Sequence, residues 1–311
     1  MSNVKMDNLR YPLLIDGGLS NVLEEMGCDL NHPLWTAKLI TENPEAIVQT
    51  HLNYILAGAD CIATASYQAS IPGLIKLGYS DIESKKIILK SVDLAYEAIK
   101  LAKENHQLVQ VPIVAASIGP YGAYLADGSE YRGNYEIIDC ELFQFHKDRI
   151  HLLAETEADL LAIETIPSLR EAKILSEILQ EVNTPSWVSF SCKDGEHLNE
   201  GASIEEAISI FTNHPSVFAV GVNCTHPKYI SSLIKRIKSC NSGKRIVVYP
   251  NSGEVYHVPT KSWLGLSEPL HFTALALDWI KLGTDLIGGC CRIGPRHIHE
   301  LRSQINDLHS Q

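Results

Sequence analysis

Long hydrophobic runs are absent from this chain of 311 residues. No segment approaches the roughly 18 uninterrupted apolar residues of a membrane-spanning helix. The first residues, Met1–Met6, also lack the apolar stretch of a signal peptide. These absences argue against an integral membrane protein and a secretory leader, so we expect a cytoplasmic protein with no membrane partner.

Positive charge is also scarce. The chain has 26 Lys and Arg against 37 Asp and Glu, a formal net charge of −11 at pH 7. Nucleic acids bind basic faces because their phosphates are negative, so we expect no nucleic-acid partner. The one dense basic cluster, Lys235–Lys238 with Lys244 and Arg245, is expected to form the solvated side of a helix and the turn after it. Small molecules are the expected substrates.

Cysteine is too sparse for a disulfide scaffold, since only eight are spread over the chain. Three of them stand where short apolar runs end. Cys224 follows Val217–Asn223, while Cys290 and Cys291 follow Thr284–Ile287 through two glycines. In a reducing compartment this grouping favours a metal site or catalytic chemistry. The others are expected to be structural or incidental: Cys28, Cys61, Cys140, Cys192 and Cys240.

The spaced glycines of a dinucleotide-binding fold are missing as well, because the first strand-like run is followed by Asp16-Gly17-Gly18. The chain instead alternates short apolar runs with amphipathic helical patterns, which is typical of a parallel sheet with helical crossovers. Eight such units predict a closed (β/α)8 TIM-like barrel of the α/β class, with residues 1–311 in a single domain. The strand-like runs are Pro12–Gly18, Ala59–Tyr67, Pro112–Pro120, Ala158–Pro167, Ser186–Cys192, Val217–Cys224, Ile246–Gly253 and Asp285–Cys291, and the helical patterns include Pro44–Gly58, Asp81–Lys103, Leu142–Glu157, Leu169–Val182, Ile204–Phe211 and His271–Leu282.

Two helix starts are marked by capping signals. Ser203 is followed three residues later by Glu206, the pattern of a capping box. Asn43 precedes Pro44, which gives a cap and then proline at the first helical position. Both signals agree with the alternation of strands and helices.

Polar and reactive residues collect at the ends of the strand-like runs, where barrels of this type carry their chemistry. Cys224 ends the sixth run and Cys290-Cys291 the eighth, two strands apart at roughly 4.8 Å per strand. Three thiolates on one rim can hold a zinc ion and leave its fourth position open. Two other interpretations are buried small hydrophobic residues and a disulfide between Cys290 and Cys291. The strand ends carry Asp16-Gly17-Gly18, Thr64–Tyr67, Gly119–Tyr121, Glu164-Thr165, Asn223-Cys224, Asn251–Gly253 and Cys290-Cys291.

A three-cysteinate zinc site has a formal charge of −1 and favours one kind of chemistry. It deprotonates a bound thiol while leaving the thiolate nucleophilic, so S-alkylation of an exogenous thiol is the best match. The alkyl donor is then expected to be cationic. Aromatic side chains at the rim could contact an onium group through cation–π interactions, with ordinary packing as the alternative role. The candidates are Trp35, Tyr67, Tyr121 and Tyr124.

Two acidic residues are placed to bind an ammonium group. Asp16 ends the first strand beside two glycines, and Glu164 follows the apolar run Leu160–Ile163. A salt bridge or a helix cap is the structural alternative for each. The long segment Gly119–Tyr135, rich in Gly and Tyr, has the length of a functional loop, and a lid is one interpretation.

These motifs together resemble the homocysteine S-methyltransferase family over essentially the whole chain. The resemblance rests on Asp16–Gly18, Gly221–Cys224, Tyr249–Gly253 and Gly288–Arg292. Further motifs are most similar to the compact bacterial and plant-type members that use S-methylmethionine: Leu34-Trp35, Thr64–Ala69 and Gly119–Tyr131.

The resemblance implies a zinc-dependent barrel that methylates homocysteine to methionine. Cys224, Cys290 and Cys291 would be the Zn²⁺ ligands and, with Glu164, would carry the reaction. The amino-acid part of homocysteine would be held by Asp16, Glu164, Thr64 and the backbone of Gly17 and Gly18. Of the aromatic candidates named above, Trp35, Tyr67 and Tyr121 are the ones expected to bind substrate.

The sequence differs from two related families of methyltransferases that use other methyl donors. Betaine–homocysteine methyltransferases have an aromatic residue after the strand-four acid, where this chain has Thr165, and the extra modules of cobalamin-dependent methionine synthase are absent. The sequence therefore predicts transfer from S-methylmethionine to homocysteine. The alternatives are another donor or acceptor (S-adenosylmethionine, betaine, selenocysteine) or a zinc- or thiol-binding sensor without turnover. A zinc hydrolase is disfavoured because His and carboxylate ligands are typical there.

Overall fold

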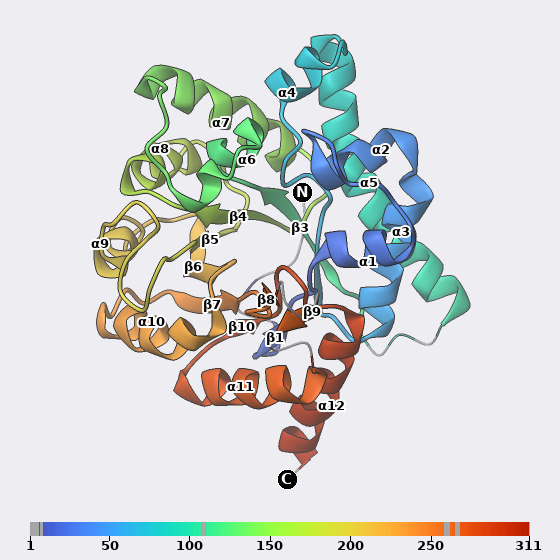
Figure 1. Ribbon diagram of the computed structural model, residues 1–311, viewed down its shortest axis with the longest axis vertical. Coiled ribbons are helices and arrows are strands. Elements are labelled where there is room, and N and C mark those ends of the chain that lie inside the picture. Colours follow the sequence, from blue (N-terminus) through green and yellow to red (C-terminus); the bar gives the residue numbers. More distant parts are fainter. Residues whose placement is uncertain are drawn as a thin grey trace.

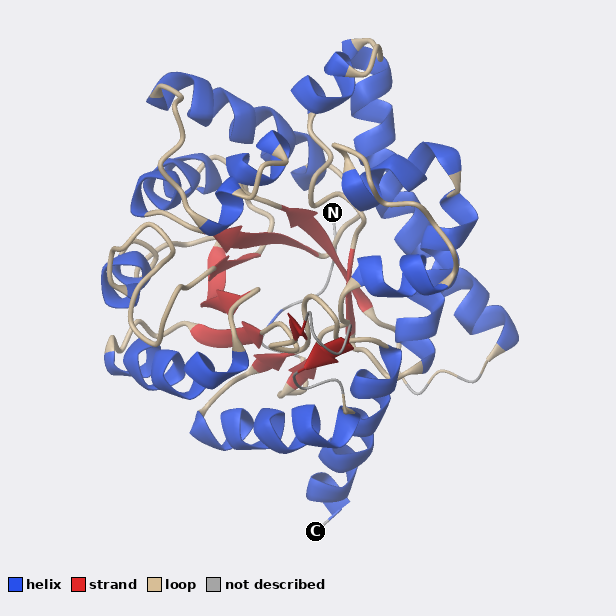
Figure 2. Ribbon diagram, viewed as in Figure 1, coloured by secondary structure: helices blue, strands red, loops and turns tan. Residues whose placement is uncertain are grey.

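Eight parallel strands form a nearly closed barrel with helices around its outside (Figure 1, Figure 2). The computed structural model describes residue 6, residues 9–106, residue 108, and residues 110–257, 262–264 and 268–310. The expected (β/α)8 architecture is confirmed. The barrel strands are β1 (Leu13–Leu14), β2 (Cys61–Ala63), β3 (Ile113–Ile118), β4 (Leu160–Ile166), β5 (Ser186–Phe190), β6 (Val217–Asn223), β7 (Arg245–Tyr249) and β10 (Leu286–Ile287).

The strands follow one another around the barrel in the order β1-β10-β7-β6-β5-β4-β3-β2. A parallel bridge between Ile15 and Cys61 joins the two ends of this sheet. Beside it, the Asp16 N–H donates to the Cys61 carbonyl at 3.0 Å, and the Asp60 N–H donates to the Leu14 carbonyl at 2.7 Å. The closure places the residue after β1 on the same rim as the residues after the other strands.

The helices cover the outside of the strands, as each crossover returns the chain to the start of the next strand (Figure 2). Within the described residues, no helix is both long enough and apolar enough to span a bilayer. The helices are α1 (Leu19–Glu25), η2 (Trp35–Lys38), α2 (Leu39–Glu42), α3 (Pro44–Leu56), α4 (Ile71–Lys76), α5 (Asp81–Asn105), α6 (Tyr121–Leu125), η3 (Ser129–Tyr131), α7 (Asp139–Ala154), α8 (Leu169–Leu179), α9 (Ile204–Ser209), α10 (Pro227–Ser239), α11 (Pro269–Leu282) and α12 (Pro295–Ser310).

Both expected helix starts are confirmed. The Asn43 side chain accepts a hydrogen bond from the Ala46 N–H at the start of α3. Ser203 and Glu206 form the reciprocal capping box of α9. Such caps satisfy backbone N–H groups that have no partner inside the helix, so they fix where each helix begins.

Two hydrophobic cores result from the alternation of side chains along the strands. On β4, Leu161 and Ile163 face the helices, whereas Leu160 and Ala162 face the barrel interior. Part of the barrel interior is filled by Trp187 of β5, which is fully buried. This packed interior closes the barrel from below and leaves the residues after the strands to form a site.

The structure adds elements that the sequence patterns do not predict. An antiparallel hairpin, β8 (Val255–His257) with β9 (Ser262–Leu264), stands between β7 and α11. The segment 119–135 is not an irregular loop, because it contains α6 and η3. The N–H of Tyr121 donates to the buried Glu171 carboxylate at 2.7 Å, which ties the start of this segment to α8. A lid role for the segment stays a prediction.

Candidate metal centre and substrate pocket

The turns after β6 and β10 bring three sulfur atoms together. The Sγ atoms of Cys224, Cys290 and Cys291 all lie within 4.8 Å of one another, the one such cluster of potential metal ligands among the described residues. Cys224 and Cys290 are joined as a disulfide with their Cα atoms 5.6 Å apart, and Cys291 is a free thiol. The pairing considered from the sequence, between Cys290 and Cys291, is therefore not the one present.

Local backbone geometry turns these cysteines towards one point. Cys224 has a φ of 45°, an uncommon conformation for a residue with a side chain. The N–H of Cys290 donates to the Pro250 carbonyl at 2.8 Å, and the carbonyl of Cys291 accepts from the Ser252 N–H at 3.0 Å. Because β10 ends at Ile287, Cys290 and Cys291 are free of the strand alternation that would point them to opposite faces.

The donor set fits a thiophilic metal ion. Thiolate sulfur is a ligand type that selects zinc, and catalytic zinc sites have three protein ligands with the fourth position left open. Burial raises the pKa of the Cys291 thiol, although its own backbone N–H and the Tyr131 hydroxyl oppose this by hydrogen bonding to the sulfur. A bound cation reverses that rise, because it stabilises the thiolate directly. Metal binding here also requires Cys224 and Cys290 in the reduced form.

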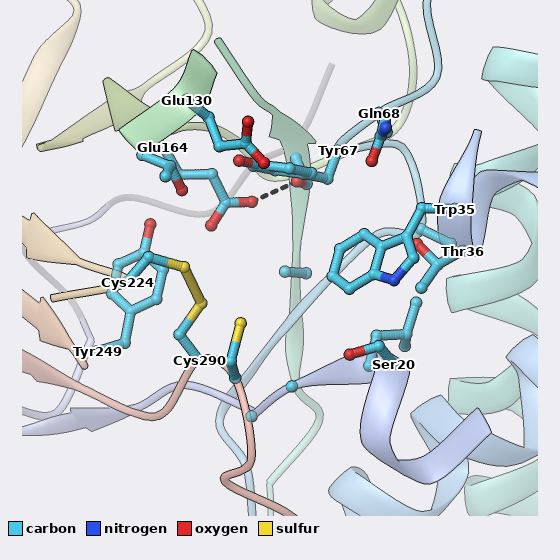
Figure 3. Close-up of a pocket in the computed structure, with 18 of the residues that line it drawn as sticks. Ser20, Trp35, Thr36, Tyr67, Gln68, Glu130, Glu164, Cys224, Tyr249 and Cys290 are labelled. Atoms are coloured by element: carbon cyan, nitrogen blue, oxygen red, sulfur yellow. Dashed lines mark hydrogen bonds between the residues drawn. A yellow bond between two sulfur atoms is a disulfide. The ribbon is translucent and has the colours of Figure 1, made fainter. Parts of the chain in front are cut away.

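A cavity of about 350 Å³ opens beside the sulfur atoms at the C-terminal ends of the strands (Figure 3). Its volume lies within the range of small-molecule sites. None of the described residues that line it is Lys or Arg, so the charged groups facing the cavity are acidic. The carboxyl groups are those of Asp16, Glu130 and Glu164, and the aromatic rings are those of Trp35, Tyr67, Tyr131, Trp187 and Tyr249.

Glu164 enters the cavity from β4. Its Oε1 accepts a hydrogen bond from the Ser117 hydroxyl, and the Tyr249 hydroxyl donates to the same carboxylate. Burial raises the pKa of Glu164 to about 6, and these two donors limit the rise. The Tyr249 hydroxyl lies 3.0 Å from the Trp187 indole nitrogen and 2.6 Å from the Ser189 hydroxyl, so its position is fixed.

Asp16 faces the same cavity from the end of β1. Its Oδ2 accepts from the Ala63 N–H at 2.9 Å, and the side chain is buried. Burial raises the pKa of Asp16, the hydrogen bond from Ala63 opposes the rise, and the charge of Glu164 adds to it. Two neighbouring buried carboxyls that disfavour each other's charge create a site that a substrate cation would stabilise.

Other residues expected at the site line the cavity, but their polar groups are engaged. The Gly18 N–H donates to the Ile293 carbonyl at 2.8 Å, so this amide does not face a ligand. A Cβ at Gly18 would lie 2.7 Å from the Cys290 carbonyl oxygen, which explains glycine there. Thr64 Oγ1 accepts from the Ser117 N–H at 3.0 Å and lies 2.6 Å from the Ser66 hydroxyl. Gly17 also lines the cavity.

The aromatic candidates separate into two groups. Trp35 and Tyr67 line the cavity, with their ring centroids 6.2 Å apart and their planes at 72°. Tyr121 and Tyr124 are not among its lining residues; they border a separate groove with Phe145, whose ring centroid lies 5.0 Å from that of Tyr121. The structure therefore brings Trp35 and Tyr67 to the sulfur cluster and does not bring Tyr121 there.

The structure also identifies pocket residues that sequence reasoning missed. Glu130 and Tyr131 belong to η3, and the Tyr131 hydroxyl hydrogen-bonds to Cys291. Ser117 and Tyr249 hold Glu164 as described above. The available signal was proximity in sequence, since Glu130 and Tyr131 lie in the Gly- and Tyr-rich segment and Tyr249 opens the Tyr249–Gly253 motif.

Comparison with known proteins gives a consistent result. The family profile described as homocysteine S-methyltransferase matches residues 13–305. Homocysteine S-methyltransferase YbgG of Bacillus subtilis (strain 168) is 46% identical over 303 residues, covering 96% of both chains. Selenocysteine Se-methyltransferase of Brassica oleracea var. italica is 43% identical over 307 residues, covering 94% of this chain and 88% of the relative.

A solved structure agrees with the sequence comparison. The metallated form of the homocysteine methyltransferase MmuM from Escherichia coli matches this fold with a TM-score of 0.85 and 38% sequence identity. The match covers 96% of this chain and 98% of that chain.

Proposed function

The chain belongs to the homocysteine S-methyltransferase family, and on this premise we propose that it transfers a methyl group from S-methylmethionine to homocysteine at a zinc ion. The observation that carries the proposal is the convergence of three cysteine sulfurs within 4.8 Å at the mouth of the cavity. Cys224, Cys290 and Cys291 would hold the zinc. When bound, zinc supplies a stabilised thiolate form of the acceptor at neutral pH.

Asp16 and Glu164 bind the acceptor's ammonium group. Both carboxyls face the cavity, and burial raises the pKa of each, so a positively charged group between them stabilises their ionised forms. Ser117 and Tyr249 hold the Glu164 carboxylate in one orientation. This positions the acceptor sulfur towards the cysteine cluster while its amino-acid part stays on the β1 and β4 side.

Trp35 and Tyr67 contact the methyl donor. Their rings line the cavity, and the faces of aromatic rings attract onium cations by about 0.5–2 kcal/mol each. In the reaction the acceptor thiolate forms a new bond to the sulfonium methyl carbon. The bond from that carbon to the donor sulfur breaks with its electron pair, leaving a neutral thioether. S-methylmethionine and homocysteine therefore give two molecules of methionine, and the thiol proton is released when the acceptor binds.

Orientation supplies much of the rate acceleration in this scheme. Methyl transfer needs the nucleophile, the carbon and the leaving sulfur in line, and holding two bound substrates in that geometry removes up to about 7–11 kcal/mol from the barrier. The buried and hydrogen-bonded carboxyls provide fixed anchor points. The packed barrel interior beneath them, with Trp187 fully buried, excludes water from that side.

A methionine-formation assay tests the proposal. The reduced protein is given homocysteine and one of S-methylmethionine, S-adenosylmethionine or betaine, with and without a chelator. We expect methionine from S-methylmethionine at the highest kcat/KM, and its loss with chelator and recovery on adding zinc. Preference for another donor, or full activity after complete zinc removal, contradicts the proposal.

A second acceptor is suggested by the 43% identical relative named selenocysteine Se-methyltransferase. Selenolate is a softer and stronger nucleophile than thiolate, and the same carboxyls would bind its ammonium group. Competition between homocysteine and selenocysteine for a limiting amount of donor measures the ratio of their kcat/KM values. A ratio above one in favour of homocysteine supports homocysteine as the substrate.

A further inference from the structure

Glu130 presents a carboxyl group to the cavity that the proposed scheme does not use. Its Oε2 is sealed from solvent, and no described residue donates a hydrogen bond to it. The Glu130 carboxyl accepts a hydrogen bond from its own backbone N–H, whereas Asp16 also accepts from Ala63 and Glu164 accepts from Ser117. A buried acceptor without a partner costs about 1–3 kcal/mol, and more if charged, so it points to a missing ligand.

The cavity side of Glu130 is aromatic, and no Lys or Arg is among the described residues that line the cavity. Arg132, outside the cavity, is the cation that acts on this carboxyl, and its charge lowers the pKa of Glu130. Figure 3 shows Glu130 and Glu164 reaching into the cavity from the same side, with the Tyr67 ring beside Glu130 and Trp35 across from them. Burial raises the pKa of the Tyr67 hydroxyl, and the neighbouring Tyr131 and Glu130 add to the rise. The nearby Arg132 points elsewhere, with its guanidinium 3.5 Å from Asp127 and 3.1 Å from the Ser129 hydroxyl.

The backbone holds Glu130 in place rather than leaving it on a loose loop. The Asp127 carboxylate accepts from the Ser129 N–H at 2.9 Å, and the Glu130 carbonyl accepts from the Ser191 hydroxyl at 3.2 Å. The Glu130 backbone also packs directly on Gly122, where a Cβ would lie 2.3 Å from the Glu130 nitrogen. A carboxyl fixed in this way is suited to recognise a ligand at a defined position.

We propose that Glu130 binds the positive charge of the methyl donor and thereby selects a cationic amino-acid sulfonium as the donor. This inference rests on the proposed function. In this inference Asp16 and Glu164 bind the acceptor. Glu130 and the rings of Tyr67 and Trp35 bind the donor. Burial raises the pKa of the Glu130 carboxyl, and a bound cation lowers it again, so donor binding and ionisation of Glu130 support each other.

The test compares Glu130→Gln with Glu136→Gln in the zinc-loaded enzyme. Glutamine keeps the shape of the side chain and removes its charge, while Glu136 is an exposed acid directly after the segment 119–135 that does not line the cavity. For Glu130→Gln we expect the KM for S-methylmethionine to rise about 10- to 100-fold, as loss of a charged hydrogen bond implies. The KM for homocysteine and all constants of Glu136→Gln should stay within about twofold of wild type.

Calorimetric titration of S-methylmethionine without acceptor gives a readout that needs no turnover. Glu130→Gln should weaken this binding by the same factor as it raises the donor KM. An unchanged donor affinity, or an equal rise in both KM values, overturns the role of Glu130. If the wild-type enzyme makes no methionine from S-methylmethionine, the proposed function fails instead, so the two failures are distinct.

A second donor identifies which positive charge Glu130 binds. Dimethylsulfonium propionate carries a sulfonium and a carboxylate but no ammonium group. If the substitution weakens S-methylmethionine and leaves this compound unaffected, Glu130 binds the ammonium group. An equal loss for both assigns it to the sulfonium, and no loss for either overturns the proposal.

Discussion

Asn223 and Thr165 exchange two hydrogen bonds: the Thr165 N–H donates to Asn223 Oδ1 at 2.7 Å, and Asn223 Nδ2 donates to Thr165 Oγ1 at 2.8 Å. Thr165 directly follows Glu164, and Asn223 directly precedes Cys224. Thr165 and Cys224 both have positive φ, 64° and 45°, a conformation that costs of order 1–3 kcal/mol. One buried amide thus fixes the pocket carboxyl and one sulfur of the cluster in a common arrangement.

Replacing Asn223 by Ala should disturb both groups at once. The Thr165 N–H loses its acceptor, so we expect the free energy of unfolding to fall by about 2–4 kcal/mol. We also expect weaker zinc retention and a higher KM for homocysteine in the folded fraction. Urea unfolding, zinc content after dialysis and steady-state kinetics measure the three effects.

Asn199→Ala is the matched control, because its amide donates one bond, to the Ser191 hydroxyl at 2.8 Å, and does not line the cavity. Asn199→Ala should lower the free energy of unfolding by about 1 kcal/mol and leave zinc retention and the KM for homocysteine unchanged. A loss of stability in Asn223→Ala without any change in zinc or homocysteine binding would mean that the amide has only a structural role.

Cys290→Ser should abolish metal retention. A serine hydroxyl is not deprotonated at neutral pH as a zinc-bound thiol is, so the cluster keeps only two sulfur ligands. We expect less than one tenth of the wild-type zinc per chain after reduction and dialysis, with loss of methyl transfer. Cys140→Ser, which removes an exposed free thiol, should retain full zinc and activity. One equivalent of zinc in Cys290→Ser would refute the ligand assignment.

Glu164→Gln should increase the stability of the protein while lowering its methyltransferase activity. Burial raises the pKa of Glu164 from its ordinary 4.5 to about 6, so the ionised carboxyl opposes folding above pH 6 by about 2 kcal/mol. Glutamine can still accept from Ser117 and carries no charge. We expect the free energy of unfolding at pH 8 to increase by up to about 2 kcal/mol, and the gain to disappear below pH 4.5, where wild-type Glu164 is protonated. A loss of stability at pH 8 would contradict this.

The same carboxyl should shape the pH dependence of the reaction. Glu164 must be ionised to bind an ammonium group, and the ionised form is lost as pH falls through about 6. We expect kcat/KM for homocysteine to fall about tenfold per pH unit below that value, since this parameter reports the free enzyme. In Glu164→Gln we expect a lower kcat/KM for homocysteine, and the acid limb due to Glu164 is lost, so that any decrease that remains at low pH comes from Asp16, whose pKa burial also raises. Zinc content measured at each pH separates the effect from metal loss.

Substitutions of two aromatic residues distinguish the pocket in the structure from the one expected from sequence. Trp35→Leu removes a ring that lines the cavity, so the KM for S-methylmethionine should rise about fivefold or more. Tyr121→Leu removes a ring that packs on Tyr124, Tyr135 and Phe145 outside the cavity. It should lower stability and leave the donor KM unchanged. The reverse pattern would place the donor near Tyr121.

Much of the fold could be predicted because its signals are local. Each apolar run of the barrel corresponds to a strand, and the caps at Asn43 and Ser203 begin helices where expected. The hydrophobic period and the capping side chains act within one turn or one strand, so they are visible in the residues themselves. The lengths of the strands could not be predicted as well, because β1 and β10 have only two residues each and are much shorter than the apolar runs that contain them. That residues 1–311 form one domain stays a prediction.

The sequence by itself determined the barrel and the three sulfurs on its rim, because strand ends in a parallel barrel meet at one edge whatever the loops do. Only the tertiary structure decided which loop side chains reach the cavity. Tyr121 lies outside the cavity, and its backbone N–H is hydrogen-bonded to Glu171 of α8. Glu130 and Tyr131 are brought in after the left-handed turn at Ala126 and Gly128 and the packing on Gly122. These orientations depend on contacts between residues far apart in the chain, which no local pattern encodes.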